Sequence, residues 1–255
     1  MLSKNQMKFI RSLHQAKFRK MYKLFLAEGP KVVHELIHSE YRIKTITAIE
    51  GWIKTHHKQL SAEIEVIPVS QKELERISTL KTPNEILAVV EIPENAPPDF
   101  NPANHLILVL DEIKDPGNMG TILRTADWFG IPRVICSQNC VDIYNPKVVQ
   151  AAMGSIARVD VIYQDLISFL HSQLDKIPVY GALMDGKNIY TEELSANGFL
   201  IIGSESHGIS ENLRPFITHP VSIPAYSEEP GIRAESLNAS IATAILCAEF
   251  RRRFI

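Results

Sequence analysis

Three short polar motifs in the C-terminal part of the chain carry side chains that could do chemistry. The first, NMGTILR, places the Asn118 amide and the Arg124 guanidinium six positions apart. The second, GSESHG, is a glycine-rich turn that carries the carboxylate of Glu205. The third, ESLNAS, puts the Ser236 hydroxyl and the Asn238 amide ahead of an apolar, helix-forming segment. Together they predict one polar site.

Each motif, taken singly, also has an ordinary structural explanation. Asn118 could cap a helix by accepting from its first backbone amides, and Ser236 or Asn238 could do the same for the final helix. Arg124 could form a surface ion pair, and Glu205 could be an exposed glutamate in an unremarkable loop. None of these explanations accounts for the three motifs together.

The elements that must position these motifs alternate between strand and helix. Six apolar, β-branched segments are predicted strands, most of them followed by helical sequence: LILVLDE, RVICS, RVDVIY, PVYGAL, GFLIIG and HPVSIP. Such alternation predicts an α/β fold with a mainly parallel sheet and helices on both faces. Ligands of these sheets bind at the carboxyl ends of the strands, where the polar motifs fall.

Two predicted helices carry apolar residues at helical spacing. The helix after the first motif is expected to bury Ile122, Leu123, Ala126 and Phe129, which leaves Arg124 on a polar face. The final helix is expected to bury one stripe, made of Leu237, Ile241, Ile245 and Ala248.

The N-terminal part has its own alternation of strand and helix. FLAEG, IKTITAI, IEVIPV and ILAVVEI are predicted strands, and PKVVHELIHS, 52–60 and 71–77 are predicted helices. Residues 1–92 are therefore predicted to form a small α/β domain led by a basic helix. Residues 93–104, with four prolines and three asparagines, are predicted to be a linker, and residues 105–255 the second domain.

The N-terminal residues are strongly basic, although the net charge of the whole chain is close to zero. The net charge is −2, which argues against a strongly basic nucleic-acid binder, but residues 1–27 contain seven basic residues and no acidic one. A solvated helix face is one explanation. Contact with a phosphate backbone is the other, because it would relieve the repulsion between like charges. The predicted RNA contacts are Lys4, Lys8, Arg11, Lys17, Arg19 and Lys20.

Other sequence features limit the possible classes of protein. Apolar runs fall far short of the ~20 residues of a membrane span, and the first residues lack a signal-peptide core. Cys136, Cys140 and Cys247 form no zinc pattern, so reduced thiols in a cytoplasmic protein without a metal are expected. GSESHG has neither a phosphate-loop lysine nor the GxGxxG pattern, which argues against nucleoside triphosphate and dinucleotide sites.

The motifs Asn-x5-Arg, G-x-E-x-x-G and IP…SLN-x-S, in this order, resemble the signature of the SpoU/TrmH family of RNA ribose methyltransferases. The resemblance spans about residues 106–250, and the N-terminal module resembles the substrate-binding domain of that family. One departure is the spacer AYSEEPGIRAE, with Glu228 and Glu229, which is longer than the family usually has before Ser-Leu-Asn.

The resemblance implies a SPOUT-type domain with a deep trefoil knot, a homodimer, and S-adenosylmethionine bound in the knot. Gly203, Ile223 and Leu237 would line the cofactor pocket, and residues 235–252 would be the segment tucked through the loop. The reaction implied is methyl transfer to a ribose 2′-hydroxyl of structured RNA, with ribosomal RNA favoured over transfer RNA.

In that reaction Arg124 would be the catalytic arginine, acting as a fixed cation beside the developing alkoxide. Asn118, Glu205, Ser236 and Asn238 would hold Arg124, the ribose and the knot loops in place. A phosphate of the RNA or a water would take the proton. Two other functions stay open: a non-catalytic RNA-binding protein that keeps the fold, and an enzyme that binds another adenine cofactor.

Overall fold

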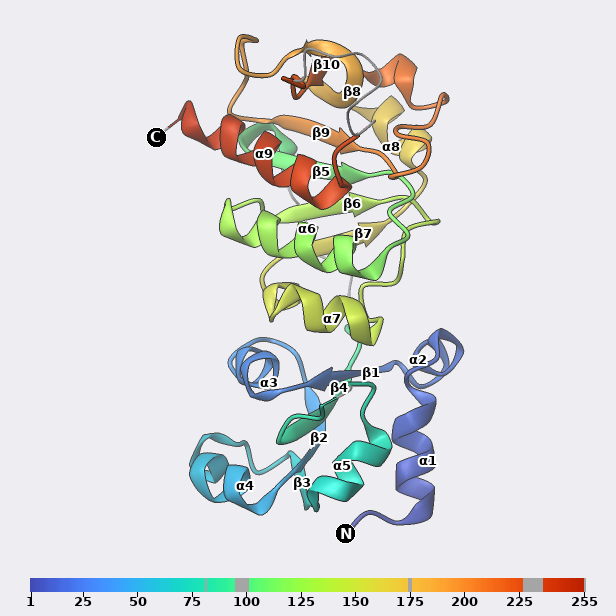
Figure 1. Cartoon of the computed structure of the whole chain (residues 1–255), viewed down its shortest axis with the longest axis vertical. Helices are drawn as coiled ribbons and strands as arrows, with labels where there is room; N and C mark the ends of the chain where they lie inside the picture. Colours follow the sequence, from blue (N-terminus) through green and yellow to red (C-terminus); the bar gives the residue numbers. More distant parts are fainter. Residues whose placement is uncertain (81, 95–100, 174–175, 227–235, 255) are drawn as a thin grey trace. The chain divides into compact units, whose positions relative to one another are not determined.

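A computed structural model describes residues 1–80, 82–94, 101–173, 176–226 and 236–254 (Figure 1). The chain forms two compact units: residues 1–96 with 142–157, and residues 97–141 with 158–255. The segment 142–157 therefore folds with the first unit, although the chain on both sides of it belongs to the second.

The first unit is built on a mixed four-stranded sheet. Its strands are β1 (Leu24–Glu28), β2 (Ile43–Ala48), β3 (Glu65–Pro68) and β4 (Ile86–Glu91), in the order β1-β4-β2-β3. β4 pairs antiparallel with β1 and β2, while β2 and β3 are parallel. The four predicted strands are confirmed.

Six α-helices surround this sheet in the described part of the first unit. They are α1 (Lys4–Ser12), α2 (Ala16–Tyr22), α3 (Pro30–Ile37), α4 (Glu50–His56), α5 (Gln71–Ile77) and α7 (Pro146–Ala152), with short 3₁₀ turns at His57–Gln59 and Ser155–Ala157. α1 and α5 share a core in which Ile10 and Leu13 contact Leu74 and Ile77 above the alternate residues of β1. α7 packs near β1, where the Tyr144 ring lies 4.8 Å from that of Phe25.

The basic leading segment is two helices, and Arg19 is not on its surface. Arg19 is 2% exposed. Its Nη1 donates to the carbonyls of Leu13 (3.1 Å) and His14 (2.9 Å), which the break between α1 and α2 leaves without helical partners. Its Nε and Nη2 donate to Asp142 at 3.0 and 2.7 Å. The prediction that Arg19 contacts RNA is therefore wrong, because this guanidinium is buried and all three of its nitrogens donate to groups inside the unit.

The second unit is built on a six-stranded sheet whose strands are all parallel. They are β5 (Leu106–Leu110), β6 (Arg133–Cys136), β7 (Asp160–Tyr163), β8 (Val179–Asn188), β9 (Gly198–Ile202) and β10 (His219–Ser222), in the order β10-β8-β9-β5-β6-β7. Short 3₁₀ turns lie at Pro102–Asn104 and Arg214–Phe216. The parallel α/β class is confirmed, and the trefoil knot stays a prediction.

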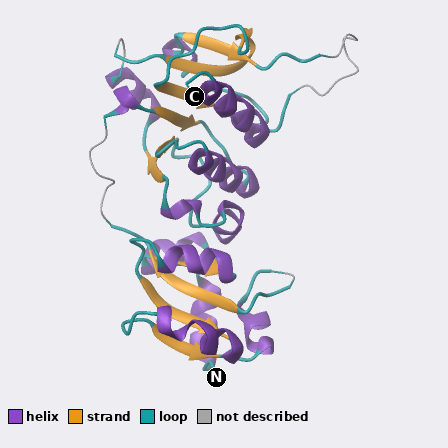
Figure 2. Ribbon diagram, turned by 90° about the vertical axis from the view of Figure 1, so that its left-hand side faces the viewer, coloured by secondary structure: helices purple, strands orange, loops and turns teal. Residues whose placement is uncertain are grey.

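Helices cover both faces of this sheet (Figures 1 and 2). α8 (Leu166–Ser172) packs on one face, where its Leu166 and Leu170 join Val109 and Phe199 in a buried cluster. α6 (Pro116–Trp128) and α9 (Ala239–Arg252) lie side by side on the other face. None of the helices in the described ranges has the length and apolar character that crossing a membrane requires.

The stripe predicted to be the buried side of α9 is its exposed side. Leu237 is 48% and Ile241 51% exposed, Ala248 is exposed as well, and Ile245 is half-buried. Several of the buried residues of α9 are small, and the full set is Ala239, Ser240, Thr243, Leu246, Cys247, Glu249 and Phe250. The helix is apolar on two sides, and the small side chains allow the close approach to the sheet. Glu235, the predicted start of this segment, lies outside the described residues.

Candidate active site

Asp115, and not Asn118, caps the first turn of α6. The Asp115 carboxylate oxygen Oδ1 accepts from the backbone amide of Asn118 at 2.8 Å, and Pro116 occupies the first helical position. The capping explanation for Asn118 is therefore excluded. Its side-chain amide is left available for other contacts at the carboxyl edge of the sheet.

A directed chain of hydrogen bonds joins the three motifs. Asn238 caps α9, because its Oδ1 accepts from the backbone amides of Ser240 (3.0 Å) and Ile241 (3.3 Å). Its Nδ2 must then point away from the helix, and it donates to Asn118 Oδ1 at 2.9 Å. The Nδ2 of Asn118 in turn donates to Glu205 Oε1. The helix cap thus decides which way both amides face, and it leaves a donor aimed at the carboxylate.

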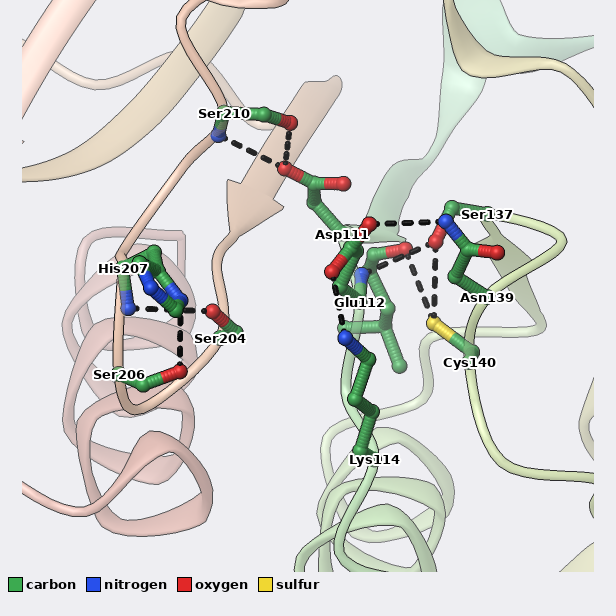
Figure 3. Close-up of polar contacts among 11 residues, drawn as sticks. Asp111, Glu112, Lys114, Ser137, Asn139, Cys140, Ser204, Ser206, His207 and Ser210 are labelled. Atoms are coloured by element: carbon green, nitrogen blue, oxygen red, sulfur yellow. Dashed lines mark hydrogen bonds and ion pairs between the residues drawn. The ribbon is translucent and has the colours of Figure 1, made fainter.

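Glu205 sits in a tightly closed loop after β9. Ser204 and Gly208 exchange two backbone hydrogen bonds, of 3.0 and 2.9 Å. A Cβ at Gly203 would lie 2.0 Å from the carbonyl carbon of Gly208, so no other residue fits this backbone approach. His207 closes the turn by donating its backbone amide to Ser204 Oγ at 3.3 Å (Figure 3).

The far end of this loop is anchored by Asp111, a residue to which sequence reasoning gave no role. Asp111 directly follows β5 and is 4% exposed. Its Oδ2 accepts from the backbone amide of Ser210 at 2.8 Å and from the Ser210 hydroxyl (Figure 3). The signal was a carboxylate directly after five apolar residues, because a carboxylate buried there needs partners.

Glu112 fixes the loop that leads into α6. It is a non-glycine residue with a φ of 56°, and its backbone amide donates to Ser137 Oγ at 2.9 Å. Its carboxylate accepts from Lys114 and from Asn139, each at 2.8 Å (Figure 3). The hydrogen bond from Lys114, and after it that from Asn139, lowers the pKa of Glu112. These contacts therefore fix the backbone shortly before the first motif.

Arg124 is exposed on α6, and within the described ranges no hydrogen bond or ion pair holds its guanidinium. The predicted burial of Ile122, Leu123 and Ala126 is confirmed, whereas Phe129 is only half-buried. The three buried residues direct Arg124 to the outer side of the helix. Ser236 is also exposed, with no hydrogen bond to the described part of the chain. The structure thus joins Asn118, Glu205 and Asn238 directly, and among the residues it describes it gives Arg124 and Ser236 no side-chain partner.

Each of the three predicted cofactor residues lies directly after a strand or just before a helix. Gly203 follows β9, Ile223 follows β10 and is half-buried, and Leu237 precedes the cap of α9. This set, a glycine and two accessible apolar side chains, fits an adenine-bearing sulfonium cofactor, because the faces of the adenine ring are apolar and its edges need backbone partners. The long spacer with Glu228 and Glu229 lies outside the described residues.

Comparisons with known proteins find matches to both parts of the chain. The model of the SpoU rRNA Methylase family matches residues 105–248, and a model described as MRM3-like substrate binding domain matches residues 4–88. The chain is 29% identical over 252 residues to the 23S rRNA (guanosine(2553)-2'-O)-methyltransferase RlmP of Bacillus subtilis, covering 98% of this chain and 97% of that one.

Solved structures resemble the whole chain. A putative RNA methyltransferase of the TrmH family from Porphyromonas gingivalis is 40% identical, with a TM-score of 0.87 and 99% of each chain covered. The AdoMet-bound rRNA methyltransferase from Sinorhizobium meliloti is 28% identical, with a TM-score of 0.87, covering 100% of this chain and 98% of that one. The chain therefore belongs to the SpoU rRNA methylase family and is an S-adenosylmethionine-dependent RNA methyltransferase.

Proposed function

We propose that this enzyme methylates a ribose 2′-hydroxyl of ribosomal RNA, with Arg124 at the acceptor oxygen. The observation that carries the proposal is the chain from Asn238 through Asn118 to Glu205, together with a guanidinium on the same helix, α6, that has no partner among the described residues. The name of the Bacillus subtilis relative, a 23S rRNA 2'-O-methyltransferase, supports ribose as the acceptor and ribosomal over transfer RNA.

The cofactor, when bound, supplies a methyl carbon that its sulfonium makes electrophilic. Gly203, Ile223 and Leu237 would hold it. What remains for the protein is to fix the acceptor hydroxyl in line and to stabilise the charge that develops on its oxygen. Fixing two reactants in a productive geometry can contribute ~7–11 kcal/mol to lowering a barrier.

Arg124 provides the charge stabilisation. A guanidinium stays protonated in proteins, so it acts as a fixed cation beside the developing alkoxide and not as a base. The proton passes to an RNA phosphate or to water. By analogy with oxyanion donors, loss of this group costs ~3–4 kcal/mol, or on the order of 10²–10³-fold in rate.

Glu205 and Ser236 orient the ribose. Asn118 occupies Oε1 of Glu205, while in the described part of the chain nothing bonds to its Oε2. That oxygen accepts from the sugar or from the Arg124 guanidinium, and the Ser236 hydroxyl makes a second contact to the ribose. Asn118 and Asn238 act through Glu205 as positioning residues.

The test is a comparison of Arg124→Ala with Thr121→Ala, an exposed position one turn earlier on α6. We expect Arg124→Ala to bind S-adenosylmethionine as the wild type does and to transfer methyl groups on the order of 10²–10³-fold more slowly. The control variant should stay near wild-type turnover. Near-normal transfer by Arg124→Ala would refute the assignment.

A homodimer is the second part of the proposal. Large apolar side chains are exposed at both ends of the α6–α9 pair: Ile241 in the first turn of α9 is 51% exposed, and Trp128 at the C-terminal end of α6 is 84% exposed. A second copy of the chain would cover them. Sedimentation at micromolar concentration should give a dimer, and Ile241→Asp should give a monomer. A monomeric wild type would refute this part.

The remaining proposals concern location and RNA contacts. The three cysteines are buried and unpaired, which supports a reducing compartment, the cytoplasm. The exposed cations of the leading helices support contact with RNA: Lys4, Lys8, Arg11, Lys17 and Lys20.

A further inference from the structure

A basic groove lies between α1 and α5 of the first unit. It has a volume of about 340 Å³ and is lined by Lys4, Met7, Lys8, Arg11 and Arg76. Arg76 comes from α5, 65 residues after Arg11 in the chain. Sequence reasoning treated the N-terminal cations as one patch and gave Arg76 no role.

Helical spacing and a shared core create this groove. Lys4, Lys8 and Arg11 recur at i, i+4 and i+7, so they share one face of α1. The buried Ile10 fixes another face of α1 against α5. Two hydrogen bonds tie the ends of the pair: Leu2 N donates to Glu73 Oε1 at 2.9 Å, and His14 Nε2 lies 2.8 Å from the Ile77 carbonyl oxygen. The packing and hydrogen bonds between α1 and α5 therefore fix the two walls of the groove.

The charges of the groove are not balanced from within. Among the described residues, no carboxylate forms an ion pair with Lys4, Lys8, Arg11 or Arg76. Glu73, the acid that ties α1 to α5, accepts instead from the backbone amides of Ser70 and Leu2. Four cations around one groove repel each other, and a ligand with repeated negative charge would relieve that repulsion.

We propose that this groove binds the phosphodiester backbone of the RNA substrate, as a contact separate from the residues that handle the target ribose. The inference rests on the proposed function, and it adds Arg76 to the RNA-binding surface. It also separates Lys4, Lys8 and Arg11, which share the groove, from Lys17 and Lys20, which lie on α2. Met7 gives the groove an apolar wall that packs against sugar and not against phosphate.

The test compares two double variants with the same change of charge. Lys8→Gln with Arg76→Gln removes two groove cations, and Lys44→Gln with Lys58→Gln removes two exposed lysines elsewhere on the same unit. Each protein, free of cofactor, is titrated into a fluorescein-labelled RNA stem–loop at several salt concentrations. The slope of log K against log salt counts the phosphate contacts, at about 0.7–0.9 each.

We expect the groove variant to lower the magnitude of that slope by about 1.4–1.8 and to weaken binding on the order of 30-fold at 0.1 M salt. The control variant should keep the wild-type slope. Equal changes in both variants, no change in either, or no binding by the wild type would overturn the inference. All four side chains are exposed, so both variants should melt like the wild type. If the groove variant melts early, Lys4→Gln with Arg11→Gln replaces it.

Failure of this inference and failure of the proposed function can be told apart. RNA binding is measured without cofactor, whereas methyl transfer by the wild type is a separate assay. A groove-dependent salt slope together with no transfer would refute the proposed function alone. Normal transfer together with an unchanged slope would refute the groove alone.

Discussion

Replacing Asn238 by aspartate should separate the structural work of this residue from its part in the active site. The cap of α9 needs only an acceptor, and aspartate caps helices as well as asparagine does. Its negative charge at a helix N-terminus is itself favourable by about 0.3–1 kcal/mol. The donor to Asn118, however, becomes an acceptor, and two acceptors then face each other at the 2.9 Å contact. Asn118 must turn over, which points its oxygen at Glu205.

The two effects have different magnitudes. One hydrogen bond lost and one charge gained at the cap nearly cancel, so the free energy of unfolding should change by no more than about 1 kcal/mol. Asn238→Ala loses the cap as well and should be destabilised by about 1 kcal/mol more than Asn238→Asp. A hydrogen bond to a carboxylate contributes about 1.5–3 kcal/mol, and the lower end applies here because the chain is exposed. The aspartate variant should therefore lose about tenfold in kcat/KM.

Urea unfolding and methyl transfer to ribosomal RNA measure the two quantities on the same preparations. The expected pattern is a stable but slow Asn238→Asp and a destabilised, slow Asn238→Ala. An aspartate variant with transfer within twofold of the wild type would refute the directed chain of amides. An Asn238→Asp variant with a free energy of unfolding as low as that of Asn238→Ala would refute the assignment of Asn238 as the cap of α9.

Three further predictions concern buried charges and thiols. Arg19→Ala should lower the free energy of unfolding by about 3 kcal/mol, because it leaves the partly buried Asp142 carboxylate and two carbonyls without their partner; a urea midpoint like that of the wild type would contradict this. A hydrogen bond from Arg252 lowers the pKa of Glu249 to about 2, so its stabilisation is fully present above pH 4.5 and is lost as the pH falls through about 2. Glu249→Gln should cost about 2 kcal/mol at pH 7, reduced from the full shift because Arg252 is largely exposed, and a difference from wild type that fails to shrink between pH 4.5 and 2 would refute the pairing. A hydrogen bond from Cys136 lowers the pKa of Cys140 to about 7, so iodoacetamide labelling followed by mass spectrometry should rise at Cys140 with a midpoint near pH 7, whereas labelling that rises only above pH 8.5 would contradict it.

The strands were predictable because their physics is local. Buried parallel strands are continuous apolar runs, and all five residues of β5 and of β9 are buried. The carboxyl ends of such strands meet at one edge, so the meeting of the motifs could also be expected. The individual hydrogen-bond partners could not be predicted, because Asn118 and Glu205 are 87 residues apart and nothing in either motif indicates the other.

The failures have physical causes as well. Periodicity finds the apolar sides of a helix, but it does not tell which side faces the sheet when two are apolar, as in α9. A charge count does not distinguish a solvated arginine from one that satisfies freed carbonyls, as Arg19 does. Composition gives no sign that residues 142–157 pack with the first unit, where Tyr144 contacts the Phe25 ring.

The most direct test of the central claim is transfer of labelled methyl groups from S-adenosylmethionine into ribosomal RNA from cells that lack this gene, followed by mapping of the labelled nucleotide. The account predicts incorporation at one nucleotide, on the ribose 2′-oxygen, which resists alkaline cleavage of the following phosphodiester. Label on a base, label confined to transfer RNA, or no label despite intact cofactor binding would contradict it.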